Sequence, residues 1–275
     1  MTVELALALL ASCLYAIASL AAVQSLVRGS AAVGRAQTLV TWGGGLCLLA
    51  ILIVRGLTLA RVPAFGLFEA LVWYGLAVTI AFLVLAASHE TPGLSGILLP
   101  YVTLVVLCSL FGVRQDIPVD PDIQSIWLGL HVVTAFIGYG LFTLESLLAV
   151  AYLIQDRNLK HKRFGPVFRR LPSLEMLDHL MQEQIGLAFL VFSLSIGLGI
   201  FLAHRSGWGT LWTTDPKVAT AAGTWLVYAI LFHLRLTADR HGRQVAIVAL
   251  AGLVSVLITF FGVHLVTGSM HDFVF

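Results

Sequence analysis

Long apolar runs separated by short polar segments dominate the sequence, and they limit what the chain can fold into. Each run approaches the 20 or so residues that a helix needs to cross the hydrocarbon core of a bilayer. The approximate bounds of the runs are 5–27, 38–54, 67–87, 96–113, 127–154, 184–203, 218–236 and 245–266. Only 11% of the residues are charged, against about a quarter in an ordinary soluble domain.

Backbone polar groups inside a bilayer must find their hydrogen bonds within the protein, and a helix bonds them within its own segment. The sequence therefore predicts an all-α, polytopic membrane protein. We expect one transmembrane domain over residues 1–275, a bundle of about eight helices. Cys13, Cys47 and Cys108 are far apart in apolar runs, so they predict small core side chains rather than a disulfide framework.

The basic residues are unevenly distributed between the two sets of alternating polar segments. Eleven of the 16 Lys and Arg residues follow the first, fifth and seventh apolar runs. Cytoplasmic segments of membrane proteins carry an excess of Lys and Arg, so these segments are predicted to be cytoplasmic. With eight spans, both termini and the segment 204–217 then lie outside.

A polar, Trp-bearing segment at 208–217 interrupts the apolar pattern with the residues WGTLWTTDPK. Asp215 and Pro216 form a typical helix start, with Asp as N-cap and Pro at the first helical position. Trp208 and Trp212 offer flat apolar faces with N–H groups at the edge, which suit a flat hydrophobic cofactor. Interfacial Trp residues also serve as membrane anchors, and that alternative stays open for this segment.

Four histidines lie where an apolar chain has little reason to place one. His131 falls near the outer end of the fifth run, and His271 lies just past the outer end of the eighth. His264 comes seven residues before His271, about 10 Å deeper if the helix continues, and His233 lies near the basic face. Two neutral imidazoles from separate helices are what six-coordinate haem iron needs. A single interfacial His can equally be a headgroup anchor or a helix–helix hydrogen bond.

The C-terminal half of the chain resembles the CcsA family of haem-handling cytochrome c assembly proteins. The resemblance covers roughly residues 127–271 and rests on 208–217, on FHLRLT at 232–237 and on the ending FFGVHLVTGSMH. That family carries an outer Trp-rich loop, the WWD domain, of the form WGxxWxWDPKE between two outer histidines. A weaker likeness is Pro63 followed by Gly66, Leu67, Phe68 and Glu69.

The resemblance implies a role for each matching residue. His131 and His271 would be the axial ligands of haem b at the outer face, and His233 would belong to an inner haem site shared with a partner protein. Lys217 or Arg205 would pair with the haem propionates. The remaining matches to the loop are Trp208, Gly209, Trp212, Asp215 and Pro216. His264 stands where the family often has Asn, so it either replaces or supplements a ligand.

The same resemblance implies a haem chaperone or a subunit of a cytochrome c synthase complex, rather than a stand-alone enzyme. The expected partners are a CcsB/ResB-like membrane protein, apocytochrome c as client and the lipid bilayer, with no nucleic acid. The expected location is the bacterial inner (cytoplasmic) membrane. Thr214, Val218 and Arg240 depart from the family pattern. They leave open a HemX-like alternative, a membrane regulator of haem synthesis that acts on glutamyl-tRNA reductase.

Three smaller features complete the sequence-based expectations. Glu145 lies inside the fifth run, where it could serve a proton path or bond to a neighbouring helix. Leu174, Leu177 and Met181 predict a short interfacial helix before the sixth run. The glycine run 43–45 predicts close helix packing.

Overall fold

The structure is a computed structural model that describes residues 3–28, 34–89, 93–112, 124–209 and 211–262, and every regular element in these residues is a helix. The long helices are α1 (Val3–Arg28), α2 (Gly34–Leu59), α3 (Leu67–Ser88), α4 (Ser95–Ser109), α5 (Ile126–Lys160), α7 (Leu174–Arg205), α8 (Pro216–Phe232) and α9 (Arg243–Leu257). The short elements are α6 (Pro166–Arg170), the 3-10 turn η1 (Leu211–Thr214) and the π turns η2 (His233–Thr237) and η3 (Ile258–Gly262).

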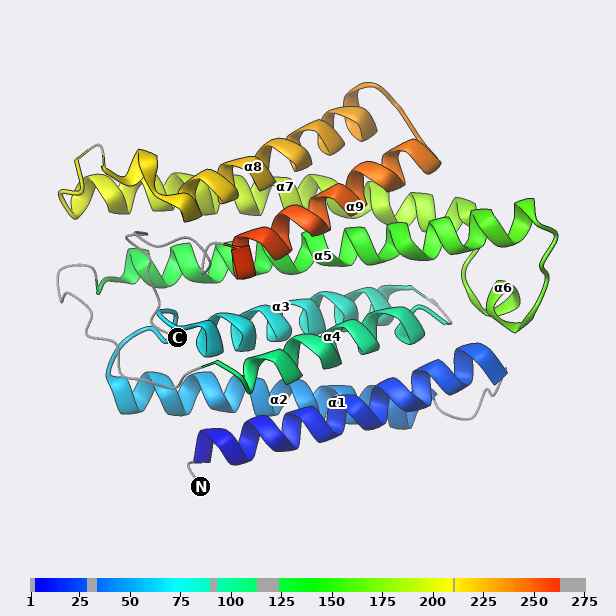
Figure 1. Cartoon of the computed structure of the whole chain (residues 1–275), viewed down its shortest axis with the longest axis horizontal. Coiled ribbons are helices and arrows are strands. Elements are labelled where there is room, and N and C mark those ends of the chain that lie inside the picture. The colour runs from blue at the N-terminus through cyan, green and yellow to red at the C-terminus, as the bar shows by residue number, and fades with distance from the viewer. Residues whose placement is uncertain (1–2, 29–33, 90–92, 113–123, 210, 263–275) are drawn as a thin grey trace.

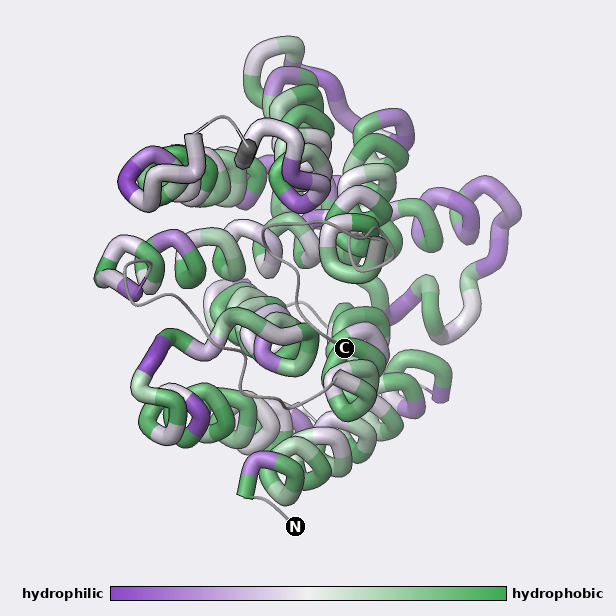
Figure 2. Tube along the Cα trace, turned by 60° about the vertical axis from the view of Figure 1, so that its left-hand side comes forward, coloured by the Kyte–Doolittle hydropathy of each residue, from purple (hydrophilic) through white to green (hydrophobic). Residues whose placement is uncertain are grey.

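The all-α membrane fold is confirmed. In the described residues, seven helices are long and apolar enough to cross a membrane. The predicted run 96–113 corresponds to α4, which is shorter at 15 residues and contains Pro100. Figure 2 shows the apolar residues along the lengths of the helices and hydrophilic residues gathered at the helix ends. Large apolar side chains such as Leu39 and Leu190 are about 70% exposed, which fits contact with lipid. The outside location of the termini stays a prediction.

Successive long helices run in opposite directions along the bundle, and α5 lies at its centre (Figure 1). Helices α1 to α4 pack together on one side of α5, and α7 to α9 pack on the other, with α3 as the main contact between the sides. A Cβ at Gly140 of α5 would lie 2.8 Å from the backbone carbon of Ala77 in α3. The two sides therefore meet at backbone-to-backbone distance.

The predicted packing role of the glycine run is confirmed at Gly44. A Cβ there would lie 2.8 Å from Cε2 of Tyr15, so α1 and α2 approach too closely for a side chain. The hydroxyl of Tyr15 is 2.8 Å from Oγ1 of Thr79 in α3. This bond joins α1 to α3, and the contact at Gly44 joins α1 to α2, as is typical of small and polar residues at membrane helix interfaces.

The prediction of a short interfacial helix before the sixth run is wrong. Residues 174–205 form the single 32-residue helix α7, whose N-cap Ser173 accepts a hydrogen bond from the amide of Met176 at 3.2 Å. Leu177 and Met181 are fully buried in the core rather than at a membrane surface. No Gly or Pro stands between Leu174 and the apolar run, so nothing breaks the helix there.

All three cysteines are free thiols, as expected without a disulfide framework. Cys13 is exposed on the bundle surface, whereas Cys47 and Cys108 are half-buried. The prediction of core positions is therefore wrong for Cys13. Cysteine is apolar enough to face lipid as readily as core, so the composition of its run could not distinguish the two environments.

Candidate functional site

The imidazole of His131 is held by the backbone of a neighbouring helix. Its Nδ1 lies 2.9 Å from the carbonyl oxygen of Ser195 in α7, and Ser195 is only 2% exposed. A carbonyl can only accept, so in the neutral ring Nδ1 carries the proton and Nε2 keeps its lone pair. An N–H to carbonyl bond of this kind orients many metal-binding histidines. The lone-pair nitrogen of His131 is thus the atom suited to bind a metal.

Gly199 makes room for the same ring. A Cβ at Gly199 would lie 2.9 Å from Cε1 and 3.3 Å from Nδ1 of His131, which is closer than side chains pack. Ser195 and Gly199 are four residues apart and therefore lie on one face of α7. We call these two residues the imidazole seat. The sequence analysis missed them, although two small residues four apart in an apolar run are a recognisable signal of close helix packing.

The start of α5 packs against the end of α7 just outside this ring. Trp127 and Phe201 form an edge-to-face pair with ring centroids 5.2 Å apart. Trp127 is still 38% exposed. Since Trp127 comes one turn before His131 on α5, the aromatic pair lies about 6 Å nearer the helix end than the histidine. His131 is therefore close to one end of the bundle rather than at its middle.

The Trp-bearing segment lies at the same end. Figure 1 shows the start of α5, the end of α7 and the start of α8 together at one end of the bundle. After α7, Gly207 and Gly209 take positive φ values of 67° and 57°, which favour glycine. Between them, the amide of Trp208 donates to the carbonyl of Ala203 at 3.1 Å. These bends turn the chain back toward α8.

The predicted helix start at Asp215 and Pro216 is confirmed. Oδ1 of Asp215 accepts hydrogen bonds from the amides of Lys217 at 2.8 Å and Val218 at 3.3 Å, and Pro216 is in the first turn of α8. Asp215 is 2% exposed. Its buried carboxylate therefore fixes where the segment ends and α8 begins.

The two tryptophans of the segment are half-buried, as is Lys217, while Thr214 is exposed. The ring of Trp212 meets that of His204 edge to face, with centroids 5.9 Å apart. His204 belongs to the last turn of α7. Trp212 thus packs on the helix that also seats His131.

A second aromatic group lies between α7 and α8, deeper than the segment. Nε1 of Trp225 donates to Oγ of Ser193 at 2.9 Å, and the rings of Trp225 and Phe189 are 5.4 Å apart. Phe189 also stacks on Phe232 at 4.9 Å. This group fastens α8 to α7 below the Trp-bearing segment.

The other predicted histidines are His233, His264 and His271. His264 and His271 lie outside the residues that the structure describes. His233 is exposed and begins the π turn η2, at the opposite end of the bundle. In the same turn, Arg235 is fully buried and its Nη1 lies 2.7 Å from Oδ1 of Asp178. The π turn therefore directs an arginine inward and leaves the histidine at the surface.

A buried ion cluster, also missed by the sequence analysis, joins α1, α2 and α3 at the end where His131 lies. Arg55 is 2.5 Å from Oε1 of Glu69 and 3.2 Å from Oε2 of Glu4. The other oxygen of Glu69 accepts the amide of Phe65 at 2.8 Å. The sequence pattern singles out Glu69 only through the weak likeness near Pro63, and it does not predict the ion pairs. The cluster fixes the loop between α2 and α3.

The same loop reaches the start of α5. Nε1 of Trp73 donates to the carbonyl of Pro63 at 2.8 Å, and its ring stacks on Phe136 of α5 with centroids 5.9 Å apart. Val62 lies 3.9 Å from the place that a Cβ of Gly129 would occupy. The loop thus supports the turn of α5 that carries His131.

Comparison with known proteins identifies the family. Residues 62–271 match the profile of the family described as "Cytochrome C assembly protein". The chain belongs to the CcsA family of cytochrome c assembly proteins. The matched region of this CcsA-family chain contains the loop at Pro63, the imidazole seat and the Trp-bearing segment, and it extends to His271.

Individual CcsA proteins align over most of the chain. The CcsA protein of Chlamydomonas reinhardtii is 31% identical over 238 residues, which are 84% of this chain and 66% of that protein. The CcsA protein of Synechococcus sp. (strain CC9311) is 29% identical over 266 residues, 86% of this chain and 87% of its own. That of Parasynechococcus marenigrum (strain WH8102) is 29% identical over 272 residues, with 90% and 88% covered.

Proposed function

We propose that this membrane protein handles haem for cytochrome c maturation and presents it at the end of the bundle where His131 lies. The observation that carries the proposal is the imidazole of His131. Its Nδ1 is bonded to the Ser195 carbonyl, which orients the ring and makes Nε2 the nitrogen suited to iron. Relatives described as cytochrome c biogenesis proteins support the same role.

Haem is the cargo in this proposal, and two features of the described residues suit it: a seated imidazole and a pair of tryptophans. The absent side chain of Gly199 admits the ring of His131, and the turn after α7 carries two half-buried tryptophans suited to a porphyrin face. His271 would supply the second axial ligand from beyond the described residues, with His264 as its alternative or supplement.

The remaining residues of the segment would orient the cargo. Asp215 fixes the start of α8 through two amide bonds, which places Lys217 in the first turn of that helix, where its ammonium group would pair with a propionate. With one haem edge left open, the thiols of an apocytochrome c could add across the vinyl groups. A CcsB/ResB-like membrane protein would be the partner, and His233 would face an inner haem position shared with it.

A reduced absorption spectrum of the purified protein tests the proposal. We expect b-type bands in the wild type and their loss when His131 and His271 are both replaced by Ala. His161→Ala and His241→Ala are matched controls, because both histidines are exposed at the opposite end of the bundle and should leave the bands unchanged. Absent bands in the wild type, or bands that survive the double replacement, would refute the proposal. The HemX-like alternative receives no support from the relatives reported above.

A further inference from the structure

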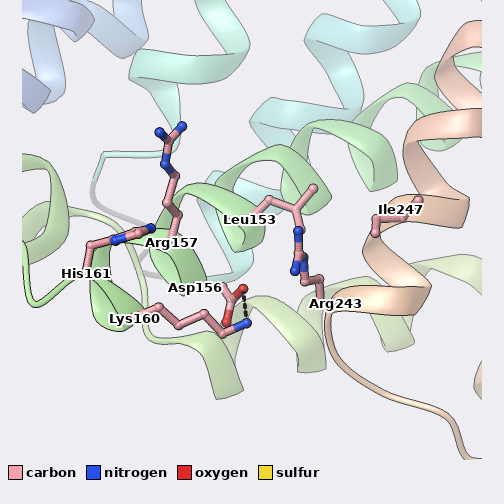
Figure 3. Close-up of a pocket in the computed structure, with 7 residues that line it drawn as sticks. All are labelled: Leu153, Asp156, Arg157, Lys160, His161, Arg243 and Ile247. Atoms are coloured by element: carbon pink, nitrogen blue, oxygen red, sulfur yellow. Dashed lines mark hydrogen bonds and ion pairs between the residues drawn. The ribbon is translucent and has the colours of Figure 1, made fainter.

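A basic pocket lies at the end of the bundle opposite His131, between the last turns of α5 and the first turn of α9 (Figure 3). Its volume is about 400 Å³. Four of its lining residues carry basic side chains: Arg157, Lys160, His161 and Arg243. The proposed handling of haem uses none of these residues.

The positive charge of the pocket is only partly balanced. Nζ of Lys160 lies 2.8 Å from Oδ2 of Asp156, which neutralises both groups. Neither Arg157 nor Arg243 forms an ion pair with any residue in the described part of the chain. Figure 3 shows the side chain of Arg243 extending from the start of α9 toward Leu153 of α5. The lining of this cavity therefore includes two arginines without an ion pair in the described residues, and Figure 3 shows the side chain of Arg157 pointing away from Arg243.

The start of α9 adds to the positive potential. The first turn of this 15-residue helix contains no acidic residue, and its N-cap Gly242 has no side chain to bond the free amides. Unpaired amides and the helix dipole favour an anion at such an end. The pocket thus offers two guanidinium groups, which bind phosphate oxygens in a forked geometry.

The deeper wall of the pocket is apolar. Leu153 and Ile247 line it one helical turn inward from the charges, and Ile247 is 50% exposed. Helix α5 has 35 residues and is about 52 Å long, which exceeds the hydrocarbon core of about 30 Å. Its apolar run stops at Ile154, so Arg157 and Lys160 lie at headgroup level. The pocket is charged where headgroups lie and apolar where acyl chains begin.

We propose that this pocket binds one anionic phospholipid. The phosphodiester would lie beside the guanidinium of Arg243, with an acyl chain along Leu153 and Ile247. The exposed side chain of Arg157, which points away from Arg243 in Figure 3, would turn toward the phosphodiester, with His161 at its side. Basic pockets between transmembrane helices are known to bind lipid headgroups of this charge. The proposal does not depend on haem binding, and it holds whether or not His131 is an iron ligand.

Native mass spectrometry of the full chain in a neutral detergent tests the proposal. The protein is titrated with phosphatidylglycerol and, separately, with phosphatidylcholine of the same acyl chains. We expect a specific adduct with phosphatidylglycerol alone. Arg157→Gln and Arg243→Gln should each weaken this adduct about fivefold, and the double variant about thirtyfold. Arg163→Gln is the matched control, because Arg163 is an exposed basic residue at the same end that does not line the pocket.

Two further measurements identify the source of the anion. Inorganic phosphate and glycerol 1-phosphate carry the charge without the acyl chains, so millimolar amounts should leave the phosphatidylglycerol adduct in place. Displacement at these concentrations would mean that the pocket takes a soluble anion, and would overturn the proposal. Equal retention of phosphatidylcholine by the wild type would overturn it without any variant, and so would a double variant with unchanged affinity.

Discussion

The substitution Gly199→Ala should disturb the candidate haem site without touching a ligand. Its new Cβ would lie 2.9 Å from Cε1 of His131, about 0.5 Å inside the 3.4 Å at which ordinary contact begins. The atom opposite is part of a rigid ring that is itself bonded to the Ser195 carbonyl at 2.9 Å. The imidazole must therefore move, and its Nδ1–H bond must lengthen or break.

The size of the effect follows from these two contacts. Overpacking of this kind costs about 1–3 kcal/mol, and the hydrogen bond contributes about 1 kcal/mol. Loss of the group that orients a metal-binding histidine weakens metal binding by about 10- to 100-fold. We expect a loss of haem affinity in this range for Gly199→Ala, measured by titration of the purified protein with haem and by its Soret band.

Gly197→Ala is the matched control, because a Cβ at Gly197 would meet nothing within 4 Å. It should keep the wild-type affinity and raise the stability of α7 slightly, since Ala favours a helix over Gly by about 1 kcal/mol. Ser195→Ala should also stay close to wild type, because the close acceptor is the main-chain oxygen and Oγ is 3.4 Å away. Wild-type affinity in Gly199→Ala, or an equal loss in Gly197→Ala, would refute the reasoning.

Two stability predictions concern buried charge and can be read from thermal unfolding in detergent. Glu145 is fully buried, and neither of its carboxylate oxygens has a hydrogen-bond partner in the described residues, so Glu145→Leu should stabilise the protein by about 1–3 kcal/mol. A lower melting temperature would contradict this. Arg55→Leu should destabilise it by about 3–5 kcal/mol, because Glu4 and Glu69 would lose the guanidinium between them and Glu69 would keep only Arg61, 3.6 Å away. Because Glu69 also pairs with Arg61, the double variant Arg55→Leu with Glu69→Leu should lose less stability than the two single variants added together, and strictly additive losses would contradict the pairing.

The sequence predicted those features that depend on one segment at a time. Apolar runs of sufficient length predict membrane helices whatever surrounds them, and Asp215 with Pro216 predicts a helix start from local backbone chemistry alone. Gly44 was predicted correctly for a similar reason, since three glycines in succession have few uses in a membrane helix other than close approach.

Features that depend on how two helices align could not be predicted in the same way. The imidazole seat exists only because His131 of α5 lies opposite Ser195 and Gly199 of α7, and no periodicity within one run states that alignment. Glu145 shows the same limit. A hydrogen bond to a neighbouring helix was one expectation for it, yet its carboxylate has no such partner in the described residues. The prediction of a separate surface helix at 174–181 was wrong because an amphipathic pattern suits both a surface helix and the buried end of a longer helix.

The buried cluster of Glu4, Arg55 and Glu69 has a consequence for how the protein is made. Its members belong to α1, α2 and α3 and emerge from the ribosome in that order. When α2 enters the membrane, only Glu4 is present to offset the charge of Arg55, and the closer carboxylate arrives with α3. A charged side chain without its partner is costly in lipid, so α1 and α2 gain their full stability in the bilayer only after α3 has been inserted. The cluster therefore joins the first three helices as they are inserted, and α4 then adds its packing on α1.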